Sequence, residues 1–355
     1  MSVTYRCAEG LTTLEGVKFP TNIYALICSH GRLTSLAGCP KGVVILDCDD
    51  NDLVSLEGCP PTVTYIKCDH NNLTSFAGIS STGALTNINC SHNRLVSLSG
   101  CPRNVTHLKC TDNRLTTLIG CPPNVIDLDC SSNAIRSLAG CPRGIGYLTC
   151  YNNELMSLAR CPQTAVYLDC ANNRISSFDS CSPRVVNLNI DHNMFTSLAG
   201  CPSSVMSIYC SFNLLTSLAG CPSSVTDLIC SFNLLSSLDG CPRRVRYLEC
   251  SNNMLTTLRG CPRTVASLSC GSNPLVVVHP RTRKRTLTEM AGIVVMDSGI
   301  RTVPGVTIPH ELHAYLSDGD SLGICGVCGA NYAAQGVIIT IAGHNVPEWK
   351  CDRCI

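Results

Sequence analysis

Apolar residues recur along this chain in a pattern that repeats every twenty residues. In one unit, Val105, Leu108, Cys110 and Leu115 are the apolar positions, with polar residues between them. Leu108, Lys109 and Cys110 alternate with period two, which predicts a short strand with one buried face. A fixed period of this length predicts a solenoid, in which each unit covers the apolar face of its neighbour.

Most units end in Gly-Cys-Pro. This sequence stops a helix, because Pro lacks a backbone donor and Gly allows conformations that other residues disfavour. A unit of twenty residues also leaves no room for a full helix opposite its strand. We therefore expect an extended convex side and a parallel concave sheet of about 13 short strands, from the one at Cys28 to the one at Cys270, with a further shortened strand around Cys7.

A polar column accompanies the apolar ones. Asn51, Asn71, Asn93 and their equivalents up to Asn273 stand three residues after the last buried position of each strand. An amide there can satisfy backbone groups that are freed where the chain turns off the strand, and stacked copies would form a ladder. We interpret this column as structural and not catalytic.

The segment from Val105 to Leu115, with Asn113 in place, matches the template Leu-x-x-Leu-x-Leu-x-x-Asn-x-Leu. The repeats therefore resemble the leucine-rich-repeat superfamily. Their short length and Pro-rich turn are most similar to repeats of bacterial effectors that enter host cells, and the Leu-x-Cys variant resembles repeat proteins of large DNA viruses, including iridoviruses. The resemblance implies an α/β-class horseshoe solenoid, mostly β. The ligases among those effectors carry a large catalytic domain after the repeats, for which too little chain remains here.

Four segments follow from these patterns: an N-terminal cap (1–20), the leucine-rich repeats (21–278), a linker (279–308) and a C-terminal module (309–355). The module holds two Cys-x-x-Cys pairs separated by 22 residues, which is the spacing of a structural zinc site. The apolar run 337–341 would supply strand structure between them. We predict a zinc-ribbon-like tail with structural Zn²⁺, where His344 could replace one thiolate. The metal ligands are Cys325, Cys328, Cys351 and Cys354.

The tail also carries a second resemblance. Ile308-Pro309, Leu312 and Tyr315-Leu316 before the Cys pairs are similar to the C-terminal ends of certain intracellular animal leucine-rich-repeat proteins. That resemblance implies a role as a substrate receptor of a ubiquitin ligase. An E3 ubiquitin ligase that uses Cys351 is the alternative function, although a RING domain needs more metal ligands than the tail holds. We predict a non-enzymatic protein.

The positions of the 28 cysteines bear on whether the protein works in a reducing or an oxidising cellular compartment. Most fall in two columns of the repeat, and where the columns lack Cys they hold Ile79 or Ile190, so these are positions for small buried hydrophobes. Column neighbours would lie one strand apart, about 4.8 Å, whereas a disulfide needs Cβ atoms about 3.8 Å apart. We expect free thiols and a cytoplasmic location, in a host cell if the protein is viral or an effector.

Two further features bear on location. The first residues contain no apolar signal core, and no apolar run has the length of a membrane span, so neither secretion nor membrane insertion is expected. The basic cluster Arg281–Arg285 fits either a nuclear-import signal or a solvated linker.

Function in a solenoid depends on the variable positions of its strand face. Here they are rich in Asp, Tyr and Phe, which predicts a protein partner with a basic surface, although solvation alone could also account for the carboxylates. A net charge of +1 and few cations on this face argue against nucleic acid. A self-assembling scaffold stays a third interpretation. The candidate partner-binding residues are Tyr65, Asp69, Asp127, Asp129, Tyr147, Tyr167, Asp169, Tyr209, Phe212, Asp227, Phe232, Tyr247 and Glu249.

One more column holds histidines: His30, His70, His92 and His192. A metal site there would need further ligands that the column does not supply. We interpret these residues as exposed turn histidines.

Overall fold

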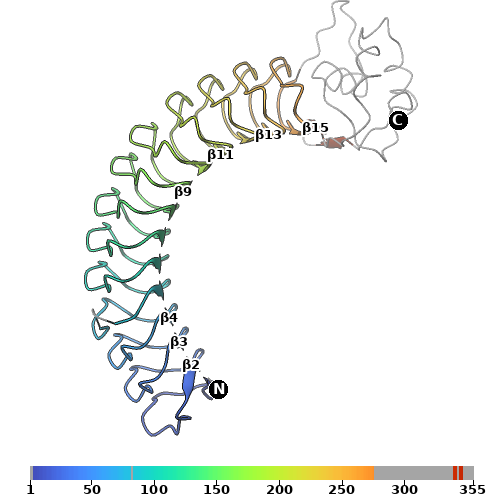
Figure 1. The fold of residues 1–355 in the computed structure, drawn as a ribbon. Coiled ribbons are helices and arrows are strands. Elements are labelled where there is room, and N and C mark those ends of the chain that lie inside the picture. Colours follow the sequence, from blue (N-terminus) through green and yellow to red (C-terminus); the bar gives the residue numbers. More distant parts are fainter. Residues whose placement is uncertain (1–2, 81–82, 276–338, 342–343, 347–355) are drawn as a thin grey trace, which may run out of the picture. The chain divides into compact units, whose positions relative to one another are not determined.

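A computed structural model describes residues 3–80, 83–275, 339–341 and 344–346. The chain divides into two compact units, Met1–Ile175 with Asp179–Val185 and Ser176–Phe178 with Val186–Ile355. Within each unit, a short strand, a turn and an extended return segment alternate along the chain (Figure 1).

The strands of the first unit lie side by side and parallel. Each pairs with the strand one repeat later, so that Leu46 lies opposite Ile66 and Leu108 lies opposite Leu128. The strands are β1 (Val3–Arg6), β2 (Ile23–Ile27), β3 (Ile45–Asp47), β4 (Tyr65–Lys67), β5 (Asn87–Asn89), β6 (His107–Lys109), β7 (Asp127–Asp129), β8 (Tyr147–Thr149) and β9 (Tyr167–Asp169).

The second unit follows the same rule, with Ile208 opposite Leu228 and Leu248 opposite Leu268. Its parallel strands are β10 (Asn187–Asn189), β11 (Ser207–Tyr209), β12 (Asp227–Ile229), β13 (Tyr247–Glu249) and β14 (Ser267–Ser269). An antiparallel pair is formed by β15 (Ile339–Ile341) and β16 (His344–Val346).

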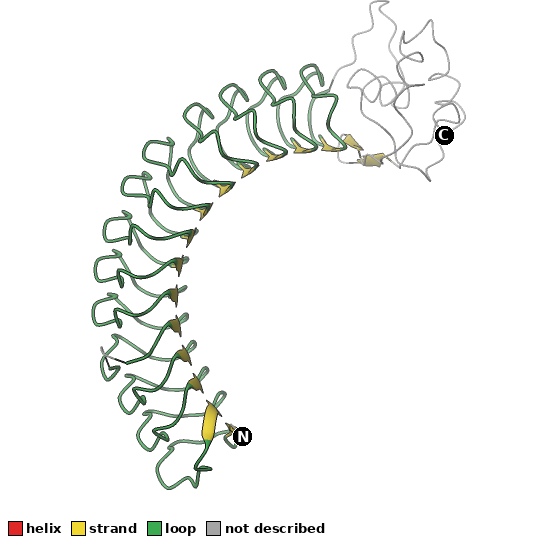
Figure 2. Cartoon of the chain, viewed as in Figure 1, coloured by secondary structure: helices red, strands yellow, loops and turns green. Residues whose placement is uncertain are grey.

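These elements confirm the predicted leucine-rich-repeat fold. Strands β2 to β14 carry the repeats, and β1 is the additional strand expected around Cys7. Figure 2 shows the strands along one side of the repeats and loops around the rest, and no helix occurs in the ranges that the structure describes. Part of the run 337–341 forms β15 as expected, while the proposed linker lies outside the described residues.

The core consists of the apolar columns that the repeat predicts, with one correction. The Cys column that precedes Pro is mostly only partly buried, as at Cys121, and so is Ile79. Val105, Cys110, Leu115 and Leu118 are all fully buried, and their equivalents are buried along both units. Ile190 takes the place of the buried Cys and is itself fully buried, which confirms that this column selects for a small apolar side chain.

The Asn ladder is present and each member makes several hydrogen bonds. The buried Asn113 accepts the backbone N–H of Leu95 at 2.9 Å. Its amide nitrogen donates to the carbonyl oxygens of Cys90 and Cys110, each at 3.1 Å, and of Thr111 at 3.2 Å. One side chain thus fastens its own turn to the preceding repeat, which is the structural role expected from the sequence.

Each repeat also contains two corners with left-handed backbone conformation. The first is the Gly before Cys-Pro, such as Gly140 with a φ of 89°. A Cβ at Gly140 would lie 2.5 Å from the backbone N of Ile119, so both the conformation and the space favour Gly at this position. Arg160 and Ser180 occupy this corner with smaller φ values of 72° and 66°. The second corner is the residue two positions after the buried Cys.

The burial of the thiols leads to a labelling prediction. Burial raises the pKa of Cys121 to about 12, and it raises the pKa of Cys110 well above its ordinary value. Cys7 is the opposite case, because a hydrogen bond from the Cys28 thiol lowers its pKa and it is only partly buried. Since the thiolate is the reactive form, N-ethylmaleimide at pH 8 should modify Cys7 first among the cysteines that the structure describes.

Mass spectrometry of digested protein would locate the modified residues over time. Cys110 and its column should react only after denaturant is added, and a Cys7→Ser variant should lose the fast phase among the described cysteines. Equal rates for Cys7 and Cys110 in the folded protein would contradict this arrangement of thiols.

Candidate functional site

The strand face exposes the first and third residues of most strands and buries the second. In β7, Leu128 is fully buried, while Asp127 and Asp129 on either side are partly exposed. The same order holds at β8, where Tyr147 is 56% exposed. Period-two reasoning therefore placed the strand members of the candidate set correctly: Tyr65, Asp127, Asp129, Tyr147, Tyr167, Asp169, Tyr209, Asp227, Tyr247 and Glu249.

An aromatic pair stands on the last two strands of the first unit, β8 and β9. The rings of Tyr147 and Tyr167, on adjacent strands, have centroids 6.3 Å apart and are tilted by 30°. Asp127 lies opposite Tyr147 on the preceding strand, and Asp129 and Asp169 occupy the third positions of β7 and β9. The structure thus brings two tyrosines and three carboxylates together over three consecutive strands.

Some of these carboxylates also cap the turn that follows their strand. Asp129 accepts hydrogen bonds from Ser131, at 3.2 Å from its backbone N and 2.7 Å from its hydroxyl. Asp169 accepts the backbone N–H of Ala171 at 3.1 Å, and Asn89 does the same for Ser91 at 3.2 Å. Sequence reasoning missed this second role, although the recurrence of Asn in the same column pointed to a local acceptor.

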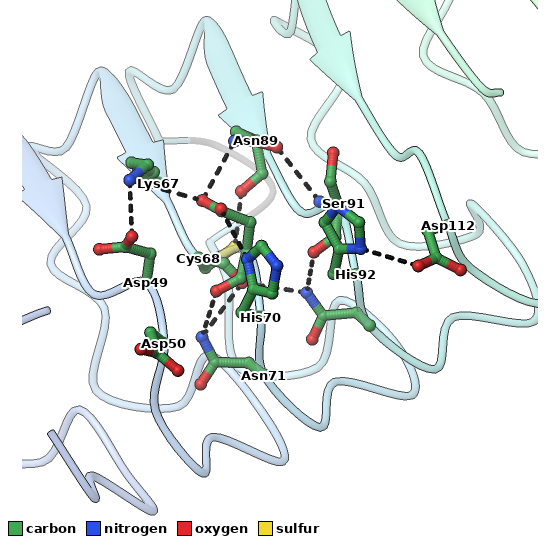
Figure 3. A network of polar contacts seen from close by, with 12 residues as sticks. Asp49, Asp50, Lys67, Cys68, His70, Asn71, Asn89, Ser91, His92 and Asp112 are labelled. Carbon is green, nitrogen blue, oxygen red and sulfur yellow. Dashed lines mark hydrogen bonds and ion pairs between the residues drawn. The ribbon is translucent and has the colours of Figure 1, made fainter. Parts of the chain in front are cut away.

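Asp69 differs from the other candidates, because the protein itself surrounds its carboxylate. The residue is 8% exposed. Its oxygens accept hydrogen bonds from Asn89 at 3.1 Å and contact the His70 ring nitrogen Nδ1 at 3.1 Å. Asp69 can therefore add charge to the face but offers little surface to a partner. Figure 3 shows the neighbouring side chains of Lys67, His70 and Asn89.

A lysine neutralises part of the acidic cluster next to it. Lys67 Nζ lies 2.6 Å from Asp49 Oδ2 and 4.0 Å from Asp69 Oδ1. Burial and a hydrogen bond with Asp49 raise the pKa of Asp47 to about 6. Burial opposes ionisation of Asp49, but hydrogen bonds with Asp47 and Lys67 outweigh it and lower the pKa of Asp49. The negative charge at β3 and β4 is therefore partly balanced by a lysine on β4, whereas strands β7 to β9 contain no Lys or Arg.

Phe212 and Phe232 do not lie on the strands. They occupy the second left-handed corner, two residues after the buried Cys, with φ values of 53° and 52°. His70, His92 and His192 belong to the same column. Sequence reasoning treated the histidines and the phenylalanines as separate groups, whereas aligning the repeats on the buried Cys would have shown one column. We name this column the turn edge, and its members are His30, Asp50, His70, His92, Asp112, Ser132, Asn152, Asn172, His192, Phe212, Phe232, Asn252 and Ser272.

Rings at the turn edge stack on one another. His70 and His92 have centroids 4.1 Å apart and nearly parallel planes. In the second unit, His192 stacks on Phe212 at 4.0 Å, and Phe212 stacks on Phe232 at 4.1 Å. A left-handed conformation is tolerated by Asn, Asp and His, but it is unfavourable for a bulky side chain, by about 1–2 kcal/mol. The two phenylalanines therefore contradict the local preference of their position.

Two of the histidines, His30 and His92, pair with carboxylates of the same column. His30 Nδ1 lies 2.8 Å from Asp50 Oδ2, and His92 Nδ1 lies 2.7 Å from Asp112 Oδ2. The hydrogen bond to Asp50 raises the pKa of His30. Within the described residues no group of three or more His, Cys, Asp or Glu side chains could hold a metal ion. The four cysteines predicted to bind zinc lie outside those residues.

In the part of the chain that the structure describes, no helix has the length and hydropathy needed to cross a membrane.

Comparisons with known proteins support the fold. No protein-family model matches the chain, and no curated protein matches it significantly. Among solved structures, it is similar to YopM, a leucine-rich effector protein from Yersinia pestis, with a TM-score of 0.65, 21% identity, and 76% of this chain and 77% of that chain covered. It is also similar to the functional domain of InlJ from Listeria monocytogenes, which includes a cysteine ladder, with a TM-score of 0.55, 24% identity, and coverage of 71% and 64%.

A third similarity is to the leucine-rich-repeat domain of APL1, with a TM-score of 0.62, 16% identity, and coverage of 77% of this chain and 89% of that chain. At this level of identity, the likeness concerns the fold alone. The chain thus has a leucine-rich-repeat fold with two exposed surfaces of distinct chemistry, the strand face and the turn edge.

Proposed function

We propose that this protein is a protein-interaction scaffold whose strand face binds a partner with a basic surface. The observation that carries the proposal is the Tyr147–Tyr167 pair on adjacent strands, flanked by Asp127, Asp129 and Asp169. Exposed aromatic rings provide apolar anchors, and surrounding carboxylates select a partner of opposite charge. Strands β7 to β9 contain no Lys or Arg, and one lysine, Lys109 on β6, lies opposite Asp129.

Affinity enrichment from an extract of candidate host cells tests this proposal. Wild-type protein should retain a defined partner that a Tyr147→Ser/Tyr167→Ser variant loses by roughly tenfold or more. The matched control is Ile119→Ser/Met156→Ser, since these exposed apolar side chains lie off the strands. If the tyrosine variant retains the same partner as wild type, or if the control loses it equally, the proposal is rejected.

The proposal also covers the cellular location of the protein and its lack of enzymatic activity. Action in the cytoplasm of a host cell, on signalling or ubiquitin pathways, follows by analogy with effectors of the same fold. A non-enzymatic role fits a repeat surface that supplies binding groups, since burial raises the pKa of thiols such as Cys110 and Cys121 and so keeps them unreactive.

We also propose that the C-terminal cysteines hold structural zinc. The purified protein should contain about one zinc ion per chain, because two Cys-x-x-Cys pairs form one tetrahedral site. A Cys325→Ser/Cys351→Ser variant should lose the metal, whereas Cys121→Ser, which alters a repeat cysteine, should retain it. Elemental mass spectrometry measures the number of zinc ions per chain in each protein. A metal-free protein whose Cys351 accepts ubiquitin as a thioester would instead establish the ligase alternative.

A further inference from the structure

The second unit carries two parallel rows of exposed apolar side chains around its turns. One row is the stacked part of the turn edge, formed by His192, Phe212 and Phe232. The other stands two residues further along each repeat, and all of its members are more than two-fifths exposed: Met194, Leu214, Leu234 and Met254. In each of these repeats a buried asparagine of the ladder separates the two rows by one residue, and we name the two rows together the apolar edge.

The fold does not require apolar residues at these places. In the first unit, the column of the second row holds Arg94, Arg114, Glu154 and Arg174, and the turn edge there holds Asp50 among other polar residues. The same backbone is therefore built with charged side chains. Exposure of the apolar side chains to water and the left-handed conformation of the two phenylalanines are both unfavourable, so a requirement other than folding accounts for them.

Area and charge limit what can cover the apolar edge. With side chains of about 200 Å² each and exposures near one half, the six non-histidine members present on the order of 500 Å². A stable dimer interface buries about 800 Å² per partner. The apolar edge is therefore too small to hold two copies of the chain together as a stable dimer. Residues 190–197, 210–217, 230–237 and 250–257 contain no Lys or Arg, which disfavours an anionic lipid surface.

We propose that the apolar edge docks an amphipathic helix of another protein. Repeats follow one another at about 4.8 Å, so the row from Met194 to Met254 covers roughly 14 Å, which matches about ten residues of helix. Asp227 and Glu249, on strands β12 and β13 of the same repeats, favour Lys or Arg on one flank of that helix. The inference rests on the proposed function in treating the chain as a protein-binding scaffold, but it assigns a second surface and a defined partner chemistry.

A labelled model peptide tests the inference with the full-length protein. The probe is a helix of about fourteen residues made of Leu and Lys, with Leu at positions i, i+3, i+4 and i+7, and its control is the same composition in scrambled order. Fluorescence anisotropy should show the patterned peptide bound roughly tenfold or more tightly than the scrambled one. A Phe212→Asn/Phe232→Asn variant should lose that preference, while its melting temperature stays equal to or above that of wild type, because Asn suits the left-handed corner.

One control and one further variant make the outcome decisive. Val54→Asn/Val96→Asn changes exposed apolar residues of the first unit and should leave peptide binding intact. Leu214→Ser/Leu234→Ser should also abolish the preference, and it replaces the phenylalanine variant should that one fail to fold. Unchanged binding in folded apolar-edge variants overturns the inference, as does equal binding of the scrambled peptide.

Other occupants are recognised by separate measurements. Wild-type dimerisation that the phenylalanine variant abolishes in sedimentation experiments would assign the edge to a second copy. Co-sedimentation with vesicles of phosphatidylcholine and phosphatidylserine, lost in the same variant, would assign it to lipid; either result overturns the inference. Tyr147→Ser/Tyr167→Ser should not affect peptide binding, so failure of this inference leaves the strand-face proposal testable on its own.

Discussion

Replacing Asn173 by Asp should lower the free energy of unfolding by about 3–5 kcal/mol at pH 7, since three carbonyl oxygens lose their donor. The Asn173 amide nitrogen donates to the carbonyl oxygens of Cys150 at 3.1 Å and of Cys170 and Ala171 at 3.0 Å. Its oxygen accepts the Leu155 N–H at 2.9 Å. A carboxylate would keep that acceptor but would face three carbonyl oxygens with negative charge.

The loss should also depend on pH. A buried carboxylate beside carbonyl oxygens has a folded-state pKa above its unfolded value, so the folded protein binds the proton more tightly. Stability of the Asn173→Asp variant should therefore rise as pH falls from neutrality toward the ordinary pKa of Asp, while the wild-type protein shows no such gain from this position.

The adjacent Asn172 provides a matched control. Asn172 is exposed, and its φ of 52° suits Asp as well as Asn. Its side-chain hydrogen bond to Asn152, at 2.9 Å, is also exposed. Asn172→Asp should change stability by less than about 0.5 kcal/mol. Urea unfolding followed by circular dichroism measures both variants, and equal effects would show that the ladder does not hold the repeats together.

The second large effect should come from Gly140→Ala. A left-handed conformation costs a residue with a Cβ about 1–2 kcal/mol, and overlap with fixed neighbours adds about 1–3 kcal/mol. At Gly140 the φ is 89°, and the new Cβ would lie 2.5 Å from the backbone of both Leu118 and Ile119. We therefore expect a loss of about 2–4 kcal/mol in the free energy of unfolding, with the lower end applying if the turn relaxes toward the φ of 72° seen at Arg160.

Two other glycines distinguish the stability cost of the left-handed φ from the cost of steric overlap with neighbouring atoms. Gly144 lies in the next turn without a left-handed φ, and a Cβ added there would meet no atom within 4 Å, so Gly144→Ala should be neutral or slightly stabilising. Gly100 has a φ of 88° but only Phe76 Cβ nearby, at 3.8 Å, so Gly100→Ala should show the conformational cost alone. Equal denaturant midpoints for all three variants would contradict the assignment of the corner to Gly.

Most of the fold could be predicted from the sequence because a repeat gives the same information many times. The period located the strands β2 to β14, and the columns of Leu108, Cys110 and Asn113 were correctly assigned to the core and the ladder. Ile190 was informative, since one exception in the Cys column showed that packing and not thiol chemistry selects the residue there.

The candidate site could be predicted only in part. Period-two alternation predicts which strand residues face outward, and it placed Tyr147 and Asp127 correctly. It has no bearing on the turn, where backbone φ decides, so it assigned Phe212 to the wrong surface. Whether a carboxylate is exposed or already hydrogen-bonded within the protein also depends on residues in the next repeat. Asp69, for example, accepts a hydrogen bond from Asn89, twenty residues away, which the sequence of a single repeat does not reveal.

The most direct test of the central claim is hydroxyl-radical footprinting of the protein with its recovered partner. If the strand face binds, oxidation of Tyr147 and Tyr167 should fall several-fold in the complex, while oxidation of Ile119 and Met156 on other surfaces stays unchanged. Unchanged oxidation of both tyrosines, with protection at Ile119 or Met156 instead, would contradict the claim that the partner binds the strand face.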